Sequence, residues 1–593
     1  MVFRKNCLKG IWGRLLFVFL LFTLAACDSG TNQAQQTSTP SPTLQLTAFN
    51  LGIPQQALQS PITGNLADST KLHVIVTFKP NAQLLKQLGS QQKNQNGQGT
   101  DVANLANQLG ITNQQYQQME SYFGVQNISL NLNKLHTSMT LDANAGAFAK
   151  LLQTHFVYHN YQKRTFFAPE TPILLPQSLA GYVKAITGLD SYSVPPKPLG
   201  AASTFQPFDA HTNQAGCVAN ENVIFPWQLR QAYGFNQLYN KGWTGKGTTI
   251  ILPELGLFSR SDVEHYFSCV SFRGKLSVVN VDNAPPTQND IEPLLDLEMV
   301  AGLLPDANIV VYQTDAGGSN YPNFWVAMQD ILNQISSDYS NFHHPAMVSV
   351  SWGGPEDYLS QGTLNSIDST LQTMTQVEHL SVFASSGDCG AYASRSYPNG
   401  RDVSFPASDP LVTAVGGTNL SVDGNGKRVG ENVWQGNPNK PSDCENEWGS
   451  GGGLSSFFQQ PNWQQGVRGL QSTYSNGMRQ VPDVAAVSNM LAGYFNGQWG
   501  YLYGTSAATP IWASGFALIN QGLIAKTGYY VNGADMPYML AHQYSSDRPF
   551  YDVVKGNNLY YPATAGWDFA TGLGTPNLGG IYQGLLTYIH AQG

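Results

Sequence analysis

The sequence predicts an α/β fold in which a mainly parallel sheet is flanked by helices, with a smaller α+β domain ahead of it. Three observations lead to this prediction. From about residue 223 to the end, short apolar runs alternate with segments of helical periodicity, which is typical of a parallel sheet. Several of these runs end in polar or glycine-rich sequence, as strands do at ligand-binding edges. Residues 61–192 instead mix short strands and helices in no regular order.

The apolar pattern places the elements of the C-terminal region. Strands are expected in the β-branched and apolar runs 248–253, 308–312, 346–351 and 380–385. Helices are expected between these runs, at 261–267, 324–335 and 359–376. Three strand ends carry unusual sequence: Pro253-Glu254, Ser351-Trp352-Gly353-Gly354 and Ser386-Gly387-Asp388-Cys389-Gly390. Because the carboxyl ends of parallel strands share one edge of a sheet, we expect these three ends to converge.

The region 61–192 carries its own predicted elements. Strands are expected at 72–78 and 137–141, and helices at 81–88, 102–109, 112–123 and 145–154. No catalytic constellation is found there, so it is either a binding module or a propeptide that folds and shields an enzyme. Residues 193–222 are rich in Pro, Ala and Ser, which indicates an exposed linker in which activation cleavage is expected.

The N-terminus has the pattern of an export signal. Basic residues precede the apolar run 15–24, which is too short for a comfortable transmembrane helix. The following Leu24-Ala25-Ala26-Cys27 resembles a bacterial lipobox, in which the cysteine is acylated and becomes the mature N-terminus. The alternative is a plain signal peptide cut near Ala26. We therefore expect a lipoprotein-type signal at 1–27 and an extracellular protein anchored by lipid to the outer face of the cell membrane.

A tether is expected after the signal, at residues 28–60. Its low-complexity part, from 28 to about 47, consists mainly of Ser, Thr, Gln, Pro and Asn. This composition suits an anchored ectodomain.

Composition limits the class of protein. The chain has 593 residues, which exceeds one ordinary domain, and only 11% of them are charged. The formal net charge is −8 and there is no basic block, which argues against nucleic acid as a partner. Outside the signal four cysteines remain, and four cysteines allow three pairings. From proximity in sequence we favour Cys217–Cys269 and Cys389–Cys444.

The stretch Gly504-Thr505-Ser506-Ala507-Ala508-Thr509-Pro510 presents a serine at a tight junction between a loop and a helix. Glycine lets the backbone approach a bound ligand closely. The helix N-terminus offers unpaired N–H groups where negative charge can collect. Ser506 is therefore a candidate nucleophile, provided that a base lies beside it.

The candidate base is a carboxylate, because no histidine stands in a strand-end or helix-start motif. Glu292 and Asp296 lie four residues apart at a predicted helix start, with Pro293 tolerated in the first turn. This spacing puts both acids on one face, close enough to share a proton. The alternative is two solvated acids that the helix dipole stabilises.

These motifs resemble those of the sedolisins, or serine-carboxyl peptidases, which are relatives of subtilisin that work in acid. Ser506 matches the nucleophile motif of the family. Glu292 and Asp296 match its Glu-x-x-x-Asp pair of base and second acid, and Asp388 matches the aspartate of its oxyanion hole. Two positions match supporting residues that extend the hydrogen-bond chain in some members: Glu254 and Trp352.

The resemblance covers nearly the whole chain beyond the tether. Further motifs follow in the family's order, at 405–408, 415–418, 451–453 and 482–484. The resemblance implies a subtilisin-like peptidase domain over 223–593 and a propeptide over 61–192, although the propeptide match is loose. It also implies protein or peptide substrates, and a propeptide that acts as an intramolecular inhibitor.

The implied chemistry follows from the residue types. Ser506 attacks the peptide carbonyl while Glu292 takes its proton, and Asp296 holds Glu292 and shares that proton. Asp388 donates to the developing oxyanion only while it is protonated. One carboxyl must be ionised and another neutral, which carboxyls satisfy best at about pH 4. The expected function is that of a secreted acid endopeptidase made as a self-processing zymogen.

Two other functions stay open on the sequence alone. One is a lipoprotein binding module that keeps the peptidase fold without turnover, although all four catalytic positions are intact. The other is a true subtilisin, which would need an aspartate and a histidine where Glu254 and the pair Glu292 and Asp296 stand.

A second constellation lies near the C-terminus. Two aspartates with backbone carbonyls make a hard-oxygen cage suited to calcium. The resemblance implies one Ca²⁺ held by these groups: the side chains of Asp552 and Asp568 and the carbonyls of Val553, Thr564 and Gly566. The alternative is a pair of turn aspartates that cap loops. The sequence departs from the family pattern at Tyr503, Thr564 and Ala565, and Tyr503 is expected to narrow the pocket beside the nucleophile.

Overall fold

The structure is a computed structural model. It describes residues 45–89, 93–95, 102–193, 205–207, 211–212, 217–219, 223–283, 285–286, 290–315, 323–393, 400–435, 448–470 and 476–591. By its internal contacts the chain divides into two units, Met1–Gln45 and Leu46–Gly593. The predicted signal peptide, Cys27 and the tether as far as residue 44 lie outside the described residues.

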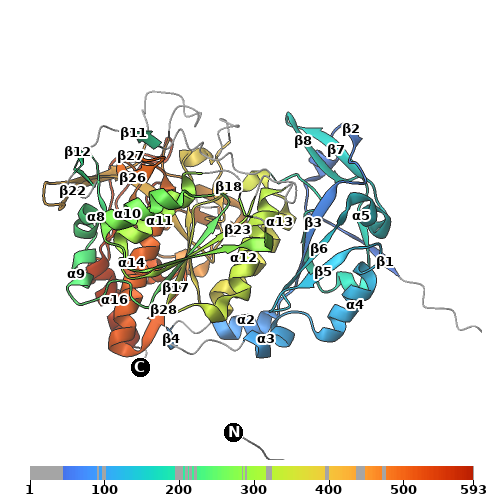
Figure 1. The fold of residues 1–593 in the computed structure, drawn as a ribbon, viewed down its shortest axis with the longest axis horizontal. Coiled ribbons are helices and arrows are strands. Elements are labelled where there is room, and N and C mark those ends of the chain that lie inside the picture. Colours follow the sequence, from blue (N-terminus) through green and yellow to red (C-terminus); the bar gives the residue numbers. More distant parts are fainter. Residues whose placement is uncertain are drawn as a thin grey trace, which may run out of the picture. The chain divides into compact units, whose positions relative to one another are not determined.

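The second unit contains a sheet whose strands are mostly parallel (Figure 1). In spatial order its strands are β15 (Lys275–Asn280), β16 (Asn308–Gln313), β14 (Thr249–Glu254), β17 (Ala346–Val350), β19 (Ser381–Ser385), β21 (Thr413–Val422) and β22 (Arg428–Val433). An additional strand, β25 (Val484–Val487), pairs in parallel with β21, and only β22 is antiparallel to its neighbour. The predicted α/β class is confirmed.

Helices cover both faces of this sheet because its central strands are apolar on both sides. In β14, Ile250 and Leu252 pack into one core, whereas Ile251 packs into the other. The first core also takes apolar residues from α8 (Pro226–Ala232), α9 (Phe235–Tyr239), α10 (Arg260–Val270), α11 (Glu292–Leu303), α14 (Thr505–Thr527), α15 (Met536–Gln543) and α16 (Leu578–Ala591). The second takes them from α12 (Phe324–Ser337) and α13 (Gln361–Gln372).

The predicted strands and helices of this region are found within one to three residues of their expected bounds, with one difference. The helix expected over 359–376 is shorter at its start and changes form at its end. Ser360 caps α13 by accepting a hydrogen bond from the Thr363 backbone N–H at 3.1 Å, so the helix begins after it. Beyond α13 the chain continues as one π-helical turn, η4 (Thr373–Val377).

Short antiparallel pairs complete the C-terminal region. They are β26 (Leu491–Phe495) with β27 (Gln498–Leu502), β23 (Gly453–Gln459) with β24 (Met478–Val481), β18 (Gly354–Pro355) with β20 (Ser404–Phe405), and β29 (Phe550–Tyr551) with β30 (Thr575–Pro576). Short 3₁₀ turns lie at η1 (Val281–Asn283), η2 (Tyr339–Asn341), η3 (Glu356–Tyr358), η5 (Gly390–Tyr392), η6 (Asn462–Gln464) and η7 (Ser545–Asp547). The β26–β27 hairpin leads directly into α14, which carries Ser506.

The N-terminal region is a separate α+β layer, as predicted. Its antiparallel sheet has the order β10 (Val183–Thr187), β3 (Lys71–Phe78), β6 (Ser138–Asn144) and β5 (Ser129–Leu132). A second sheet consists of β2 (Ile62–Asn65), β7 (Phe156–Tyr161) and β8 (Arg164–Pro169). Its helices are α2 (Ala82–Gly89), α3 (Val102–Leu109), α4 (Asn113–Phe123), α5 (Ala145–Leu152) and α6 (Gln177–Ala180).

The tether was expected to extend to residue 60, and this is wrong for its last part. Residues from Leu46 onward fold, as β1 (Leu46–Phe49), which pairs with β9 (Ile173–Pro176), and as α1 (Gln55–Leu58). The reason is apolar burial: three side chains of this stretch lie in the core of the N-terminal region, Leu51, Ile53 and Ala57. Their hydrophobic contribution outweighs the polar composition that precedes them.

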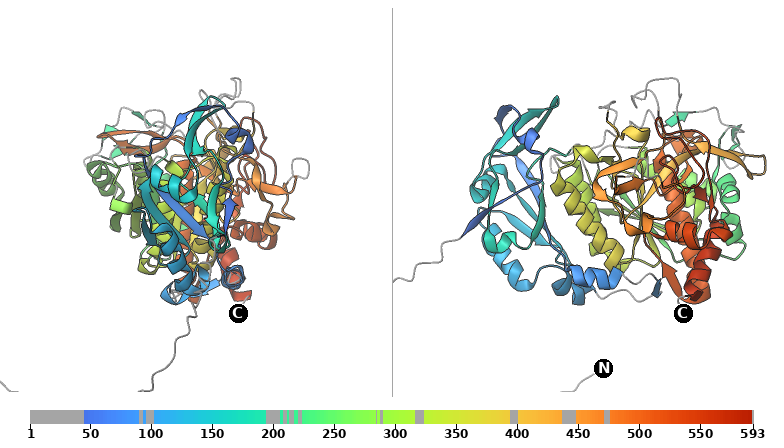
Figure 2. Two further views of the ribbon diagram at one scale, coloured as in Figure 1. Left: turned by 90° about the vertical axis from the view of Figure 1, so that its right-hand side faces the viewer. Right: turned by 180° about the vertical axis from the view of Figure 1, so that it is seen from behind.

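The N-terminal region, blue to cyan in Figure 2, lies beside the yellow-green helices α12 and α13. Polar side chains form the contact between them. At the centre of this contact Gln329 of α12 accepts a hydrogen bond from Thr187 and donates one to Thr77, both at 3.0 Å. At one side, Lys184 pairs with Asp368 of α13 at 2.9 Å. All of these groups are buried or partly buried, so the contact is a specific interface between the two regions.

The linker and the cysteines are described only in part. Cys217 and Cys269 form a disulfide, as predicted. Cys389 is also disulfide-bonded, but Cys444 lies outside the described residues. In the linker three short strands are described, β11 (Phe205–Pro207), which pairs with β27, and β12 (His211–Thr212) with β13 (Val218–Ala219); β4 (Lys93–Gln95) pairs with β28 (Tyr529–Val531). Among the described residues no helix is long and apolar enough to cross a membrane.

Candidate active site

Ser506 lies in the first turn of α14, where the loop-to-helix junction was predicted. The residue before the helix, Gly504, has a φ of +121°, a conformation that side chains rarely adopt. A Cβ atom on Gly504 would also lie 3.0 Å from a carboxylate oxygen of Asp388. Glycine is therefore required here for both backbone shape and close approach, and Ser506 itself is 5% exposed.

Glu292 faces the nucleophile from the first turn of α11. Its carboxyl lies near enough to the Ser506 hydroxyl to be influenced by it. Asp290 anchors the start of the helix by accepting a hydrogen bond from the Glu292 backbone N–H at 3.2 Å. Burial raises the pKa of Glu292 well above its ordinary value, and the negative charge of Asp296 adds to this, whereas the Ser506 hydroxyl lowers it. A carboxyl, and not an imidazole, thus lies beside Ser506.

Asp296 lies one turn further along α11 and is fully buried. We expected it to share a proton with Glu292; its negative charge raises the pKa of Glu292, and its own carboxyl also lies close to that of Glu254 at the end of β14. The spacing of four residues put both acids on one face without fixing where each carboxyl points. Glu254 in turn accepts a hydrogen bond from Trp352 Nε1 at 2.9 Å.

Burial is the main influence on these carboxyls. It raises the pKa of Asp296 and that of Glu254 well above ordinary values. The charge of Glu254 raises the pKa of Asp296 further, whereas the hydrogen bond from Trp352 lowers that of Glu254. Glu292, Asp296 and Glu254 interact with one another and therefore titrate together. The protons that they hold are shared among the three carboxyls and are not assigned to one residue.

Asp388 approaches from the loop after β19. One of its carboxylate oxygens, Oδ1, accepts hydrogen bonds from the backbone N–H and the hydroxyl of Thr505, at 2.8 and 2.7 Å. Because Oδ1 is held as an acceptor, a proton on this carboxyl belongs on Oδ2. Asp388 also carries a negative charge close enough to Glu292 to raise its pKa. The arrangement suits a donor placed beside the nucleophile.

The three unusual strand ends converge, as the fold class predicts. Trp352 after β17 reaches Glu254 of β14, and Ser385 of β19 donates to the Ser351 carbonyl at 3.0 Å. The sequence did not single out two residues of the site, Ser351 and Thr505. Both lie within motifs that the sequence did identify, but a motif does not show in which direction a side chain points.

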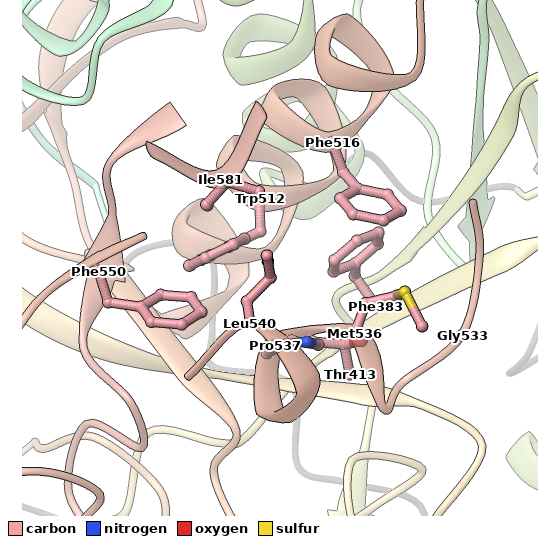
Figure 3. Close-up of a pocket in the computed structure, with 10 residues that line it drawn as sticks. All are labelled: Phe383, Thr413, Trp512, Phe516, Gly533, Met536, Pro537, Leu540, Phe550 and Ile581. Atoms are coloured by element: carbon pink, nitrogen blue, oxygen red, sulfur yellow. The ribbon is translucent and has the colours of Figure 1, made fainter. Parts of the chain in front are cut away.

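One apolar pocket lies beside α14, and none of these carboxyls lines it (Figure 3). Trp512 and Phe516 of α14 point into it, opposite Phe383 of β19 and Met536 of α15. The rings of Phe383 and Phe516 lie 5.7 Å apart, edge to face. Its lining carries no ionisable group, so this pocket belongs to the packing that anchors α14.

The predicted calcium ligands lie in one loop region. Asp568 is buried, and its Oδ2 accepts a hydrogen bond from the Thr564 N–H at 3.0 Å. Asp552 Oδ2 accepts one from the Gly566 N–H at 2.9 Å. Within the described part of the chain, no hydrogen bond is donated to the carbonyls of Val553, Thr564 and Gly566. Burial raises the pKa of Asp568 to about 6, so a cation there would favour the ionised form. These oxygens fit a hard cation.

A second group of possible metal ligands lies between the N-terminal region and α12: His73, Asp282 and Asp330. His73 lies between two carboxylates, 2.6 Å from Asp142 and 2.9 Å from Asp330. Burial lowers the pKa of His73, but the charges of Asp330 and Asp142 outweigh this and raise it to about 11. An imidazolium has no lone pair for a metal, so this group is an ion pair of the interface.

Many carboxyls outside the site are also buried, which gives a prediction for stability against pH. Burial raises the pKa of Glu378 and that of Asp402 to about 8 each. Unfolded carboxyls titrate near pH 4, so the folded state binds more protons between about pH 4 and 8. The two protonated carboxyls stabilise the folded state fully below about pH 4, and this stabilisation is lost as the pH rises through 8. We expect the Tm of the Ser506→Ala precursor to fall by at least about 5 °C from pH 4 to pH 8.

Differential scanning fluorimetry measures this shift, and the Ser506→Ala background prevents self-cleavage during the scan. Glu378→Gln is the matched variant, because its amide is neutral at every pH while its oxygen still accepts from Ser336. It is expected to reduce the difference in Tm between the two pH values. A Tm that rises from pH 4 to pH 8 contradicts the prediction.

Comparisons with known proteins agree with this geometry. A model of the subtilase family matches residues 281–549, and a model of the pro-kumamolisin activation domain matches residues 61–192. Kumamolisin of Bacillus sp. (strain MN-32) is 31% identical over 461 residues, which cover 74% of this chain and 76% of the relative. Sedolisin of Pseudomonas sp. (strain 101) is 28% identical over 566 residues, which cover 90% and 88%.

A solved structure extends the comparison to the fold. It is that of Pseudomonas sedolisin, described as a serine-carboxyl proteinase complexed with two molecules of pseudo-iodotyrostatin. It matches with a TM-score of 0.52 at 26% identity, covering 63% of this chain and 100% of that one. The subtilisin-like architecture and the N-terminal activation domain are thus shared with these relatives.

Proposed function

Because the chain belongs to the sedolisin family of serine-carboxyl peptidases, we propose that it is an acid-acting endopeptidase whose nucleophile is Ser506. It is a serine-type peptidase made as a zymogen, since an activation domain precedes the peptidase domain. The observation that carries the proposal is the buried Glu292 carboxyl, which lies near enough to the Ser506 hydroxyl for that hydroxyl to lower its pKa. It gives the serine a base that works only while its carboxyl is ionised.

In this proposal the Ser506 hydroxyl attacks the peptide carbonyl, and Glu292 accepts the proton and later delivers it to the leaving amine. Asp296 and Glu254 share a further proton next to Glu292. The negative charge is thereby distributed over the three carboxyls. Trp352 orients Glu254 through the bond at 2.9 Å. Asp388, protonated on Oδ2, donates to the oxyanion that forms beside the N-terminus of α14.

The proposal requires acid for two reasons. Asp388 donates only while it keeps its proton, and the set around Glu292 must hold protons as well as one negative charge. Burial raises the pKa of Glu292, Asp296 and Glu254, so proton sharing persists where exposed carboxyls have lost their protons. At neutral pH an ionised Asp388 repels the oxyanion instead of binding it.

The two other candidate functions receive less support. A binding module without turnover has no need for the buried and energetically costly carboxyls around Ser506. A true subtilisin would need an imidazole facing the serine, whereas Glu292 faces it here.

The deciding experiment is incubation of the purified precursor in acid, followed by N-terminal sequencing of the products. We expect self-cleavage between residues 193 and 222 at about pH 4, and none in the Ser506→Ala precursor. The mature product should hydrolyse an unfolded protein substrate at the same pH. Processing and hydrolysis that are fastest at neutral pH would refute acid action.

We propose one calcium ion in the loop of Asp552 and Asp568, with the carbonyls of Val553, Thr564 and Gly566 as further ligands. Such an ion would fix the loop that follows β29 by hard oxygen contacts. Added Ca²⁺ at 100 times its Kd should stabilise the folded protein by about 2.7 kcal/mol, raising the Tm by several degrees.

The measurement compares the Tm of the Ser506→Ala precursor in Ca²⁺ and in EDTA. Asp568→Ala should abolish the difference between the two. Asp423→Ala is the matched control, because Asp423 caps a turn by accepting from Asn425 N–H at 2.9 Å and belongs to no predicted cage. Equal Tm values in Ca²⁺ and EDTA for the precursor would remove calcium from the account.

Export and lipid anchoring at Cys27 remain part of the proposal, on the basis of the lipobox-like sequence alone. Labelling cells with a palmitate analogue distinguishes the two signal types. The chain should take up label and Cys27→Ser should not, whereas an unlabelled exported chain would indicate the plain signal peptide.

A further inference from the structure

Ser351 lies where three elements of the site meet. Its hydroxyl oxygen is 2.8 Å from each carboxylate oxygen of Asp296 and 3.3 Å from the backbone carbonyl of Ser506. Its own carbonyl accepts a hydrogen bond from the Ser385 hydroxyl at 3.0 Å. Ser351 is 9% exposed, so water does not readily replace these contacts. Ser351 thus connects α11 and α14 through its side chain and β19 through its backbone carbonyl.

The hydroxyl of a serine carries one proton, so Ser351 donates to one acceptor at a time. While the Asp296 carboxyl is ionised, the charged acceptor is the stronger partner and Ser351 donates to it. When a proton shared by the three acids moves to the Asp296 oxygen that faces Ser351, the Ser351 hydroxyl accepts a hydrogen bond from Asp296 instead of donating one. Its own proton then turns to the Ser506 carbonyl, the remaining acceptor within reach.

We propose that Ser351 is a positioning residue that couples the protonation of Asp296 to the backbone of the nucleophile. This inference rests on the proposed function. Ser351 does not touch the reacting atoms. It stabilises the ionised form of the acid set and ties the first turn of α14 to that set, so that the serine and its base keep their alignment.

Loss of the Ser351 hydroxyl has a definite electrostatic consequence. The bond from Ser351 lowers the pKa of Asp296 against the opposing effects of burial and of Glu254. A hydrogen bond to a charged group contributes about 1.5 kcal/mol, which corresponds to about one pH unit and about tenfold in rate. Without this hydrogen bond the three acids ionise at higher pH, so the acid limb of the pH–rate profile moves to higher pH.

The test compares Ser351→Ala with Ser385→Ala in the full precursor. Ser385 is the matched control because it is equally buried, loses the same hydroxyl and bonds to the same residue without touching an acid. The rate of self-processing is measured from pH 2 to 7, and kcat and KM are then measured on the mature products. Thermal unfolding of both variants in the Ser506→Ala background confirms that they fold.

For Ser351→Ala we expect kcat to fall about tenfold with KM unchanged, and the acid limb to move up by about one unit. Ser385→Ala should keep the acid limb of the parent. An unmoved limb in Ser351→Ala, an equal shift in Ser385→Ala, or complete loss of activity at every pH in a folded Ser351→Ala overturns the inference. Residual activity of Ser506→Ala, by contrast, would refute the proposed function and not this step.

Discussion

Replacement of Ser506 with alanine is expected to abolish self-processing and peptide hydrolysis, with a loss of about a million-fold. In the proposed mechanism the Ser506 hydroxyl forms the acyl-enzyme and supplies the proton that Glu292 takes. Quantitative assay of a fluorogenic peptide at pH 4 measures the loss, and gel analysis of the precursor shows whether the propeptide is cleaved.

Ser514→Ala is the matched control for this substitution. Ser514 lies on the same helix and is fully buried, and its hydroxyl has no hydrogen-bond partner among the described residues. Its removal should therefore leave both stability and activity near those of the parent. If Ser506→Ala still processed itself at a tenth of the parental rate, another nucleophile would have to be sought.

Replacement of Asp388 is expected to have the second largest effect. Asp388→Ala removes the proposed oxyanion donor and also the acceptor that holds Thr505 at 2.7 and 2.8 Å. Loss of one such donor typically lowers kcat about 100- to 1000-fold. We expect this loss at every pH, because an alanine side chain has no proton to donate at this position. The measurement is kcat of the mature variant, obtained by processing at pH 4.

Asp388→Asn distinguishes the effect of the proton on the Asp388 carboxyl from the effect of the shape of the side chain. Its amide oxygen can still accept from Thr505, and its NH₂ group donates at any pH. We expect activity within about tenfold of the parent in acid and an alkaline limb that moves upward by at least about one unit. An unchanged alkaline limb in Asp388→Asn would show that another group sets the loss of activity towards neutral pH.

The sequence was sufficient for the fold class and for most of the residues that meet at the candidate site, because these follow from local patterns and motifs. Apolar strands buried on both faces identified the parallel sheet, and the ends of β14, β17 and β19 met as parallel strands require. The helix starts carrying Glu292 and Ser506 were marked by a proline and a glycine, which constrain the backbone.

Contacts between distant side chains could not be predicted from these patterns. Helical spacing placed Asp296 near Glu292, but it could not show that the Asp296 carboxyl also lies close to Glu254, on a strand about forty-two residues earlier. The role of Ser351 depends on the same three-dimensional register. The folded stretch from Leu46 onward escaped prediction because its polar composition conceals three apolar residues that are buried by the rest of the N-terminal region.

The central claim is that a group of buried carboxyls acts as the general base, a role that an imidazole has in a true subtilisin. It is tested most directly by the pH dependence of kcat/KM for the mature enzyme between pH 2 and 8. The account predicts a bell-shaped profile with its maximum near pH 4–5 and less than a tenth of that activity at pH 7. A maximum near pH 7, with activity lost in acid as a histidine would lose it, contradicts the account.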